Sequence, residues 1–212
     1  MRVIPLAGNH DRQGFDCGRQ ELNDWLRKVA RQHQDKGLSK TFVAIREDAP
    51  DRIHGYYALT LAELENRHLP ESWRKKLPRR ISGVRLGRLA VDQRHHGKGL
   101  GELLLVDALT RAQRVYTEAG GIGLFVDAID EQAASYYRRF GFDACPDHPL
   151  LLFLPVQVME CALDNRTEDA HPELDRQGCR RQAPQGRAIP PAGTGAGTVL
   201  RNRRQRQPDH AG

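Results

Sequence analysis

Three glycines at alternate positions, Gly97, Gly99 and Gly101, stand between two apolar runs and suit the binding of a phosphate. The first turn of an α-helix has unpaired N–H groups and carries the positive end of the helix dipole. Glycine has no Cβ to keep an anion away from those N–H groups. Arg94 and Lys98 add mobile positive charge beside the turn. The spacing therefore predicts a site for a phosphate-bearing ligand where a helix begins.

The same spacing separates this turn from two better-known phosphate loops. A P-loop requires G-x-x-x-x-G-K-[ST], which the chain lacks. The dinucleotide fingerprint G-x-G-x-x-G also fails, because the third glycine comes one residue early. A glycine-rich turn that only connects two elements is the alternative.

The apolar pattern predicts the elements that must position this turn. A strand at 84–92 precedes the glycines, and a helix at 100–116 follows them. Further strands are expected at 40–47, 53–65, 121–129 and 150–156, the first two paired, and further helices at 22–34, 71–76 and 131–140. This mixed order predicts an α/β domain.

Length and composition divide the chain into two parts. The 212 residues suit one domain with some chain left over. We expect the domain at 1–162 and a disordered Pro/Gly/Arg-rich tail at 163–212, because the tail has too little apolar periodicity to form a core. No run approaches the roughly 18 apolar residues of a membrane helix, and the N-terminus lacks signal-peptide features.

Cysteine usage indicates a reducing compartment. Cys17, Cys145, Cys161 and Cys179 form no CxxC pair and have no metal-like spacing. We therefore expect a cytoplasmic protein without a disulfide framework and without a bound metal.

Positive charge is concentrated in one stretch. The chain has a net charge of +6, and residues 67–94 hold nine basic and two acidic residues. Such a field favours an anionic partner, although a solvated surface stretch is the alternative. The candidate nucleic-acid-binding residues are Arg74, Lys75, Lys76, Arg79, Arg80 and Arg85.

The glycine turn resembles a known family signature. Arg94, Gly97 and Gly99 match R/Q-x-x-G-x-G/A of the GNAT acetyltransferase superfamily, whose loop holds the pyrophosphate of acetyl-coenzyme A. The segments "FDCGRQELNDWL", "LGRLAVD" and "SYYRRFGF" resemble one branch, the TacT/AtaT-type toxins of toxin–antitoxin pairs, and the likeness covers about residues 5–157. The resemblance implies a mixed central sheet, with a splayed strand pair at the acetyl-CoA site and helices on its flanks.

The resemblance also implies roles for particular residues. The backbone of Leu89, Ala90 and Val91 would pair with the pantetheine arm, and the pyrophosphate would lie on Arg94, Gly97, Lys98, Gly99, Leu100 and Gly101. Tyr137 would protonate the departing thiolate, since a phenol with a pKa of about 10 can donate to a thiolate whose conjugate acid lies near about 8.5. The alternative for Tyr137 is a buried aromatic anchor, and Tyr136 is expected to serve packing.

The implied activity is acetylation of the α-amino group of aminoacyl-tRNA, which blocks translation. A ribbon-helix-helix antitoxin and a homodimer are implied as well. An α-amino group with a pKa of about 8, lowered further by the adjacent ester, is largely neutral and needs no strong base. This agrees with the sequence, where Asp127 and Asp130 have no clear histidine partner and His95 and His96 are only possible proton carriers. The alternatives are a GNAT enzyme acting on a protein or small-molecule amine, and a catalytically silent anion-binding module.

Overall fold

A computed structural model describes residues 1–75 and 77–160 of the chain. Lys76 and the tail expected at 163–212 lie outside the described residues, as do Cys161 and Cys179. The two other cysteines, Cys17 and Cys145, are buried free thiols.

Seven strands form one mixed sheet in the order β1-β2-β3-β4-β5-β7-β6. Neighbours are antiparallel except for the parallel pair β4–β5. The strands are β1 (Arg2–Pro5), β2 (Lys40–Ile45), β3 (Gly55–Glu65), β4 (Arg80–Val91), β5 (Gly123–Asp127), β6 (Asp143–Cys145) and β7 (His148–Pro155). The helices are α1 (Gln20–Asp24), η1 (Trp25–Val29), α2 (Ala30–Asp35), η2 (Asn66–His68), α3 (Glu71–Arg74), η3 (Gln93–His95), α4 (Leu100–Ala119) and α5 (Glu131–Arg138).

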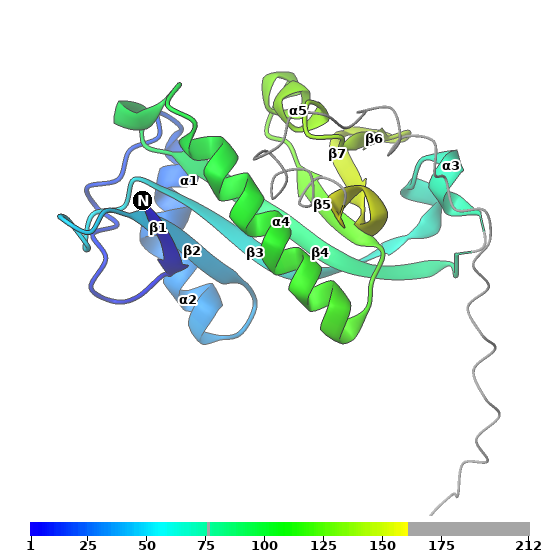
Figure 1. Ribbon diagram of the computed structural model, residues 1–212, viewed down its shortest axis with the longest axis horizontal. Helices are drawn as coiled ribbons and strands as arrows, with labels where there is room; N and C mark the ends of the chain where they lie inside the picture. The colour runs from blue at the N-terminus through cyan, green and yellow to red at the C-terminus, as the bar shows by residue number, and fades with distance from the viewer. Residues whose placement is uncertain (76, 161–212) are drawn as a thin grey trace, which may run out of the picture. The chain divides into compact units, whose positions relative to one another are not determined.

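Helices cover both faces of the sheet (Figure 1). On one face α4 buries a stripe that includes Leu104, Leu105 and Ala108 in the largest core cluster, to which α5 also contributes. On the other face, α1 to α2 close a second cluster around Leu26 and Tyr56. The expectation of a mixed α/β fold with flanking helices is confirmed.

The parallel strands β4 and β5 separate after a short pairing. Only the β4 residues Val84–Leu86 pair with β5, where their partners are Leu124–Val126. Beyond them, β4 continues to Val91 along β3. Opposite Ala58 and Leu59, β4 carries one extra residue, Gly87. A bulge of this kind bends the strand and increases its twist. The second half of β4 therefore leaves β5, which produces the expected splayed pair.

Three features of the fold differ from the sequence-based expectation. The helix predicted at 22–34 runs from Gln20 to Asp35 and contains a π-helical turn, Trp25–Val29. Within it the Leu22 carbonyl accepts the Tyr56 hydroxyl at 2.8 Å, a tertiary bond that periodicity cannot reveal. The edge strands β1 and β6 were not predicted, because four and three residues are too short for an alternating pattern.

Candidate active site

The glycine turn lies where β4 meets α4. Gly97 and Gly99 have φ values of +71° and +76°, a region that side chains with a Cβ rarely adopt, and a Cβ at either residue would meet no atom within 4 Å. Gly99 is the N-cap of α4 and offers no side-chain cap. Leu103 N–H donates to the Gly99 carbonyl at 3.1 Å, so the N–H groups before it begin the helix without an intrahelical acceptor. An anion can approach these groups over open space.

Arg94 has a different environment from the one that the sequence suggested. Its guanidinium holds the Asp92 carboxylate through two bonds, Nε to Oδ1 at 2.7 Å and NH2 to Oδ2 at 2.6 Å. Asp92 is 1% exposed, and it also accepts the backbone N–H of Arg94 at 3.1 Å and of Asp16 at 3.4 Å. The prediction of a mobile charge at Arg94 is therefore wrong: the arginine braces the turn through Asp92.

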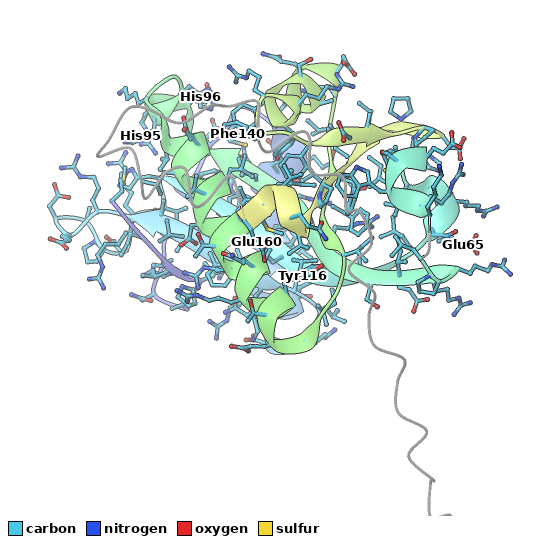
Figure 2. The ribbon with its side chains drawn as sticks, turned by 45° about the vertical axis from the view of Figure 1, so that its right-hand side comes forward. Glu65, His95, His96, Tyr116, Phe140 and Glu160 are labelled. Atoms are coloured by element: carbon cyan, nitrogen blue, oxygen red, sulfur yellow. The ribbon has the colours of Figure 1, made fainter. Side chains whose placement is uncertain are left out.

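The other charged and polar residues of the turn are also engaged. Lys98 Nζ donates to the Arg94 carbonyl at 2.9 Å, and His96 Nε2 donates to the Val91 carbonyl at 2.8 Å. Figure 2 shows His95 and His96 together at the N-terminal end of α4. Burial lowers the pKa of His95. The bonds of Lys98 and His96 fix the shape of the turn, and both side chains stay exposed at its surface.

The predicted pantetheine strand lies along the open edge of β4. Leu89, Ala90 and Val91 pair with β3 on one side and extend beyond the last β5 partner on the other. Leu89 and Val91 pack against the α4 cluster, while Ala90 is buried in the cluster on the opposite face. Leu100 is buried in the core, so only its backbone faces the turn.

Two adjoining cavities occupy the gap between the splayed strands, with volumes of about 180 and about 300 Å³. Leu89, Ile129, Ala133 and Tyr137 line both of them. The larger cavity reaches Gly101 in the first turn of α4, where a Cβ would stand 3.4 Å from the Tyr136 hydroxyl. The smaller cavity continues to Glu21, Arg88 and Asp127 on the other side of Tyr137. Tyr137 thus stands between a compartment beside the glycine turn and a second compartment with charged residues.

Tyr137 is 6% exposed and lies on α5. Its ring packs against Phe142 at 5.6 Å and against Tyr136 at 5.4 Å between centroids. Burial raises the pKa of Tyr137 above that of a free phenol, and the neighbouring Tyr136 contributes in the same direction. The phenol therefore keeps its proton throughout the physiological range.

The residues proposed for nucleic acid lie toward the far end of β3 and β4. Arg79 and Arg80 are 83% and 74% exposed at their side chains and pair with Glu65 at 3.4 Å and Glu63 at 3.3 Å. Figure 2 shows Glu65 well separated from His95. Arg74 and Lys75 are exposed at the end of α3, and Arg85 lies 3.3 Å from Asp127. Exposed ion pairs of this kind contribute little to stability.

The contacts of several site residues were not predicted from the sequence. Asp130 caps α5 through Ala133 N–H and pairs with Arg19 at 2.5 Å across the larger cavity. Both ring nitrogens of His54 are buried without a hydrogen-bond partner in the described part of the chain, and this ring lies 4.5 Å from that of His95. The N-cap role of Asp130, two residues before an apolar helix pattern, is the one feature that the sequence could have revealed.

Within residues 1–75 and 77–160, no helix is long and apolar enough to cross a membrane. The same residues contain no group of three or more His, Cys, Asp or Glu side chains able to hold a metal ion.

Comparison with known proteins gives consistent similarities. A model of the acetyltransferase (GNAT) domain matches residues 37–144. A tRNA-acetylating toxin of Mycobacterium tuberculosis is 34% identical over 149 residues, which cover 70% of this chain and 88% of that protein. The structure of AtaT complexed with acetyl-methionyl-tRNAfMet matches with a TM-score of 0.70 and 32% identity, over 76% of this chain and 97% of that chain. A mutant AtaT toxin bound to the C-terminus of the antitoxin AtaR and acetyl-CoA matches with a TM-score of 0.65 and 28% identity, over 77% and 97%.

Proposed function

This chain belongs to the GNAT acetyltransferase family, and from that premise we propose that it is a toxin that acetylates the α-amino group of an aminoacyl-tRNA. The observation that carries the proposal is the position of Tyr137 between two cavities, one reaching the glycine turn and the other open to an acceptor. The M. tuberculosis relative is a tRNA-acetylating toxin, and AtaT has been solved with an acetylated methionyl-tRNA.

The glycine turn and the splayed strands suit acetyl-CoA as the co-substrate. The N–H groups at the start of α4 would receive the pyrophosphate, since Gly97 and Gly99 leave the approach open. The unpaired edge of β4 at Leu89 to Val91 would bond the pantetheine arm and direct its acetyl group to the wall that both cavities share. The structure of AtaT with AtaR and acetyl-CoA is consistent with this choice.

Tyr137 would serve as the proton donor. The acceptor nitrogen attacks the acetyl carbonyl, a C–N bond forms, the C–S bond breaks, and the departing sulfur takes the Tyr137 proton. The proton that the nitrogen loses passes to solvent, from which Tyr137 is reprotonated. Burial raises the pKa of Tyr137, but a thiolate in the same cavity loses its hydration too, so its conjugate acid also becomes weaker. The two groups therefore stay close enough in proton affinity for the transfer.

An acceptor that needs no dedicated base would suit the two aspartates of this site. Asp127 and Asp130 are each paired with an arginine, and hydrogen bonding to the Ala133 N–H lowers the pKa of Asp130. Asp130, held in this way, is a weak proton acceptor. An ester-activated amine with a pKa below about 8 loses its own proton to water and does not require a dedicated base.

The exposed arginines at the start of β4 would hold the acceptor stem. Contacts from Arg79 and Arg80 to phosphates are independent of sequence and weaken with salt. An A-form stem is recognised through its shape and backbone rather than its base edges. Arg74, Lys75 and Arg85 would extend the contact, with Lys76 as a sequence-based candidate.

The same assignment extends to partners and location. Because AtaT binds the C-terminus of its antitoxin AtaR, we propose that this chain is neutralised by a small antitoxin of the ribbon-helix-helix type and forms a homodimer. Charged tRNA is a cytoplasmic substrate, so the toxin would act in the cytoplasm. We expect a small antitoxin gene beside this one, and co-expression with it, followed by sizing of the complex, tests both partners.

The deciding experiment incubates the protein with labelled acetyl-CoA and total charged tRNA and then identifies the acetylated amino acid. Label in one or a few aminoacyl-tRNAs is the expected result. Label only in ribosomal proteins or small amines would assign the enzyme to another acceptor. Calorimetry that detects no association with acetyl-CoA, even after any co-purified antitoxin is removed, would remove the enzymatic assignment itself.

A further inference from the structure

Arg88 lies at the charged end of the smaller cavity with most of its donors unused. It follows the Gly87 bulge on β4 and lines the same cavity as Tyr137. One terminal nitrogen donates to the Gly87 carbonyl at 2.6 Å, and the other is 3.9 Å from Glu21. Its Nε is buried without a hydrogen-bond partner among the described residues. A guanidinium has five N–H donors, so this arginine is equipped to bind a further acceptor.

An aromatic layer supports the guanidinium from the helical side. The Arg88 guanidinium carbon lies 5.7 Å from the centroid of the Trp25 ring. That indole stacks on Tyr56 with centroids 5.8 Å apart and planes 9° apart. The Tyr56 hydroxyl is bonded to the Leu22 carbonyl, so the layer is anchored in both the sheet and the helix. We call Trp25 and Arg88 together the Trp25–Arg88 platform.

The backbone at Trp25 is unusual. The π-helical turn Trp25–Val29 interrupts an otherwise α-helical segment and begins at this residue. Such turns are rare and often occur at functional sites. Trp25 stays partly exposed, whereas the next residue, Leu26, is fully buried.

We propose that the Trp25–Arg88 platform binds the terminal nucleotide of the acceptor, with its base stacked on the guanidinium and its sugar or phosphate oxygens bonded to the free N–H donors. The inference rests on the proposed function. The amino acid is esterified to the terminal ribose through its carboxyl group, so bringing its amine to Tyr137 brings that nucleotide to the cavity. Because Arg88 and Tyr137 line one cavity, both lie within reach of a single nucleotide. Unpaired bases of RNA commonly stack on aromatic rings or on guanidinium planes.

The test compares two small acceptors that carry the amino acid identified in the labelling experiment. One is the 3′-aminoacyl ester of adenosine, and the other is the methyl ester of the same amino acid, which has no nucleoside. The wild-type enzyme should show a lower KM for aminoacyl-adenosine than for the methyl ester. Arg88→Leu and Trp25→Leu should each raise the KM for aminoacyl-adenosine by roughly 10- to 100-fold, the range that a stacked base supplies. Their KM values for the methyl ester and for acetyl-CoA should stay within about twofold of wild type.

Two further variants separate stacking from general support of the fold. Trp25→Tyr keeps an aromatic face and should restore most of the affinity for aminoacyl-adenosine. Trp73→Leu removes the other tryptophan, whose ring centroid lies 6.4 Å from that of Phe153. This variant should leave the KM for both small acceptors unchanged.

The outcomes distinguish this inference from the function on which it rests. If the two leucine variants change the KM of both acceptors equally, or change neither, the platform does not bind the nucleotide and only supports the cavity. If the wild-type enzyme uses both acceptors with the same KM, the inference fails while the proposed function stands. If it acetylates neither acceptor nor charged tRNA, the proposed function fails first.

Discussion

Replacing the buried carboxylate beneath the glycine turn (Asp92→Asn) should destabilise the fold measurably. Burial alone would raise the pKa of Asp92, but the hydrogen bonds from Arg94 and from backbone N–H groups hold it at about 2. Against an ordinary value of 3.8, and with each pKa unit equal to about 1.4 kcal/mol, the charged form contributes on the order of 2 to 3 kcal/mol at neutral pH. Asparagine has nearly the same size but no charge, so this contribution is lost.

The pH dependence of the effect follows from the direction of that shift. Because the pKa of Asp92 is lower in the folded protein, its contribution is complete above about pH 4 and is lost as the pH falls toward about 2. Urea unfolding of wild type and variant should therefore show the full difference at pH 7 and roughly half of it at pH 3. Calorimetry at pH 7 should also show weaker acetyl-CoA binding, because Arg94 loses the partner that positions the turn.

A matched control is present in the chain. Arg46 holds Asp48 through the same two-point contact, at 2.8 and 2.6 Å and with the same sequence spacing, but the side chains are 53% and 63% exposed. Asp48→Asn should unfold like wild type, since solvent screens an exposed pair. Equal destabilisation by both substitutions, or a pH-independent difference for Asp92→Asn, would show that the buried pair does not act as described.

The remaining predictions concern the reaction. Tyr137→Phe should lower kcat by roughly 10²- to 10⁴-fold with unchanged acetyl-CoA affinity, as single-turnover assays and calorimetry would show; normal turnover would assign the acid elsewhere. Gly99→Asp should weaken acetyl-CoA binding by at least about tenfold, because it places a carboxylate at the helix N-terminus and a Cβ at a φ of +76°; unchanged affinity in calorimetry would contradict the amide cradle. The double variant Arg79→Gln, Arg80→Gln should raise the KM for charged tRNA and flatten its salt dependence; an unchanged salt slope would exclude both arginines from the interface. Because burial raises the pKa of Tyr137, kcat should not fall through ionisation of this phenol up to about pH 10. A decline of kcat with rising pH below about pH 10 would identify a different proton donor.

Local pattern and spacing predicted much of the fold. The strand–turn–helix unit around Gly97 and Gly99, and the amphipathic face of α4, depend on neighbours a few residues apart, which a sequence displays directly. The order of strands and helices predicted an α/β domain for the same reason, and the resemblance to the GNAT family implied the mixed sheet. The edge strands were missed because they are held by pairing with β2 and β7 rather than by their own pattern.

The parts of the site that escaped prediction depend on distant partners. Arg94 was read as a mobile charge, since nothing in its local sequence shows that Asp92 is buried and accepts its guanidinium. The count of charged residues over 67–94 likewise left out Glu63 and Glu65. The pairing of β3 with β4 brings these two acids beside Arg80 and Arg79. A count along the chain overestimates a field that acids on the adjacent strand partly cancel.

The extra residue in β4 puts the two halves of that strand out of phase. Before Gly87 the even-numbered residues Val84 and Leu86 face α4, and after it the odd-numbered Leu89 and Val91 do so. An added Cβ at Gly87 would meet nothing within 4 Å, so this position accommodates substitution. Loss of the residue would leave Leu86 and Leu89 on the α4 face and Arg88 on the other, but it would remove the bulge that bends the second half of β4 away from β5. The length of this strand is therefore under tighter constraint than its composition.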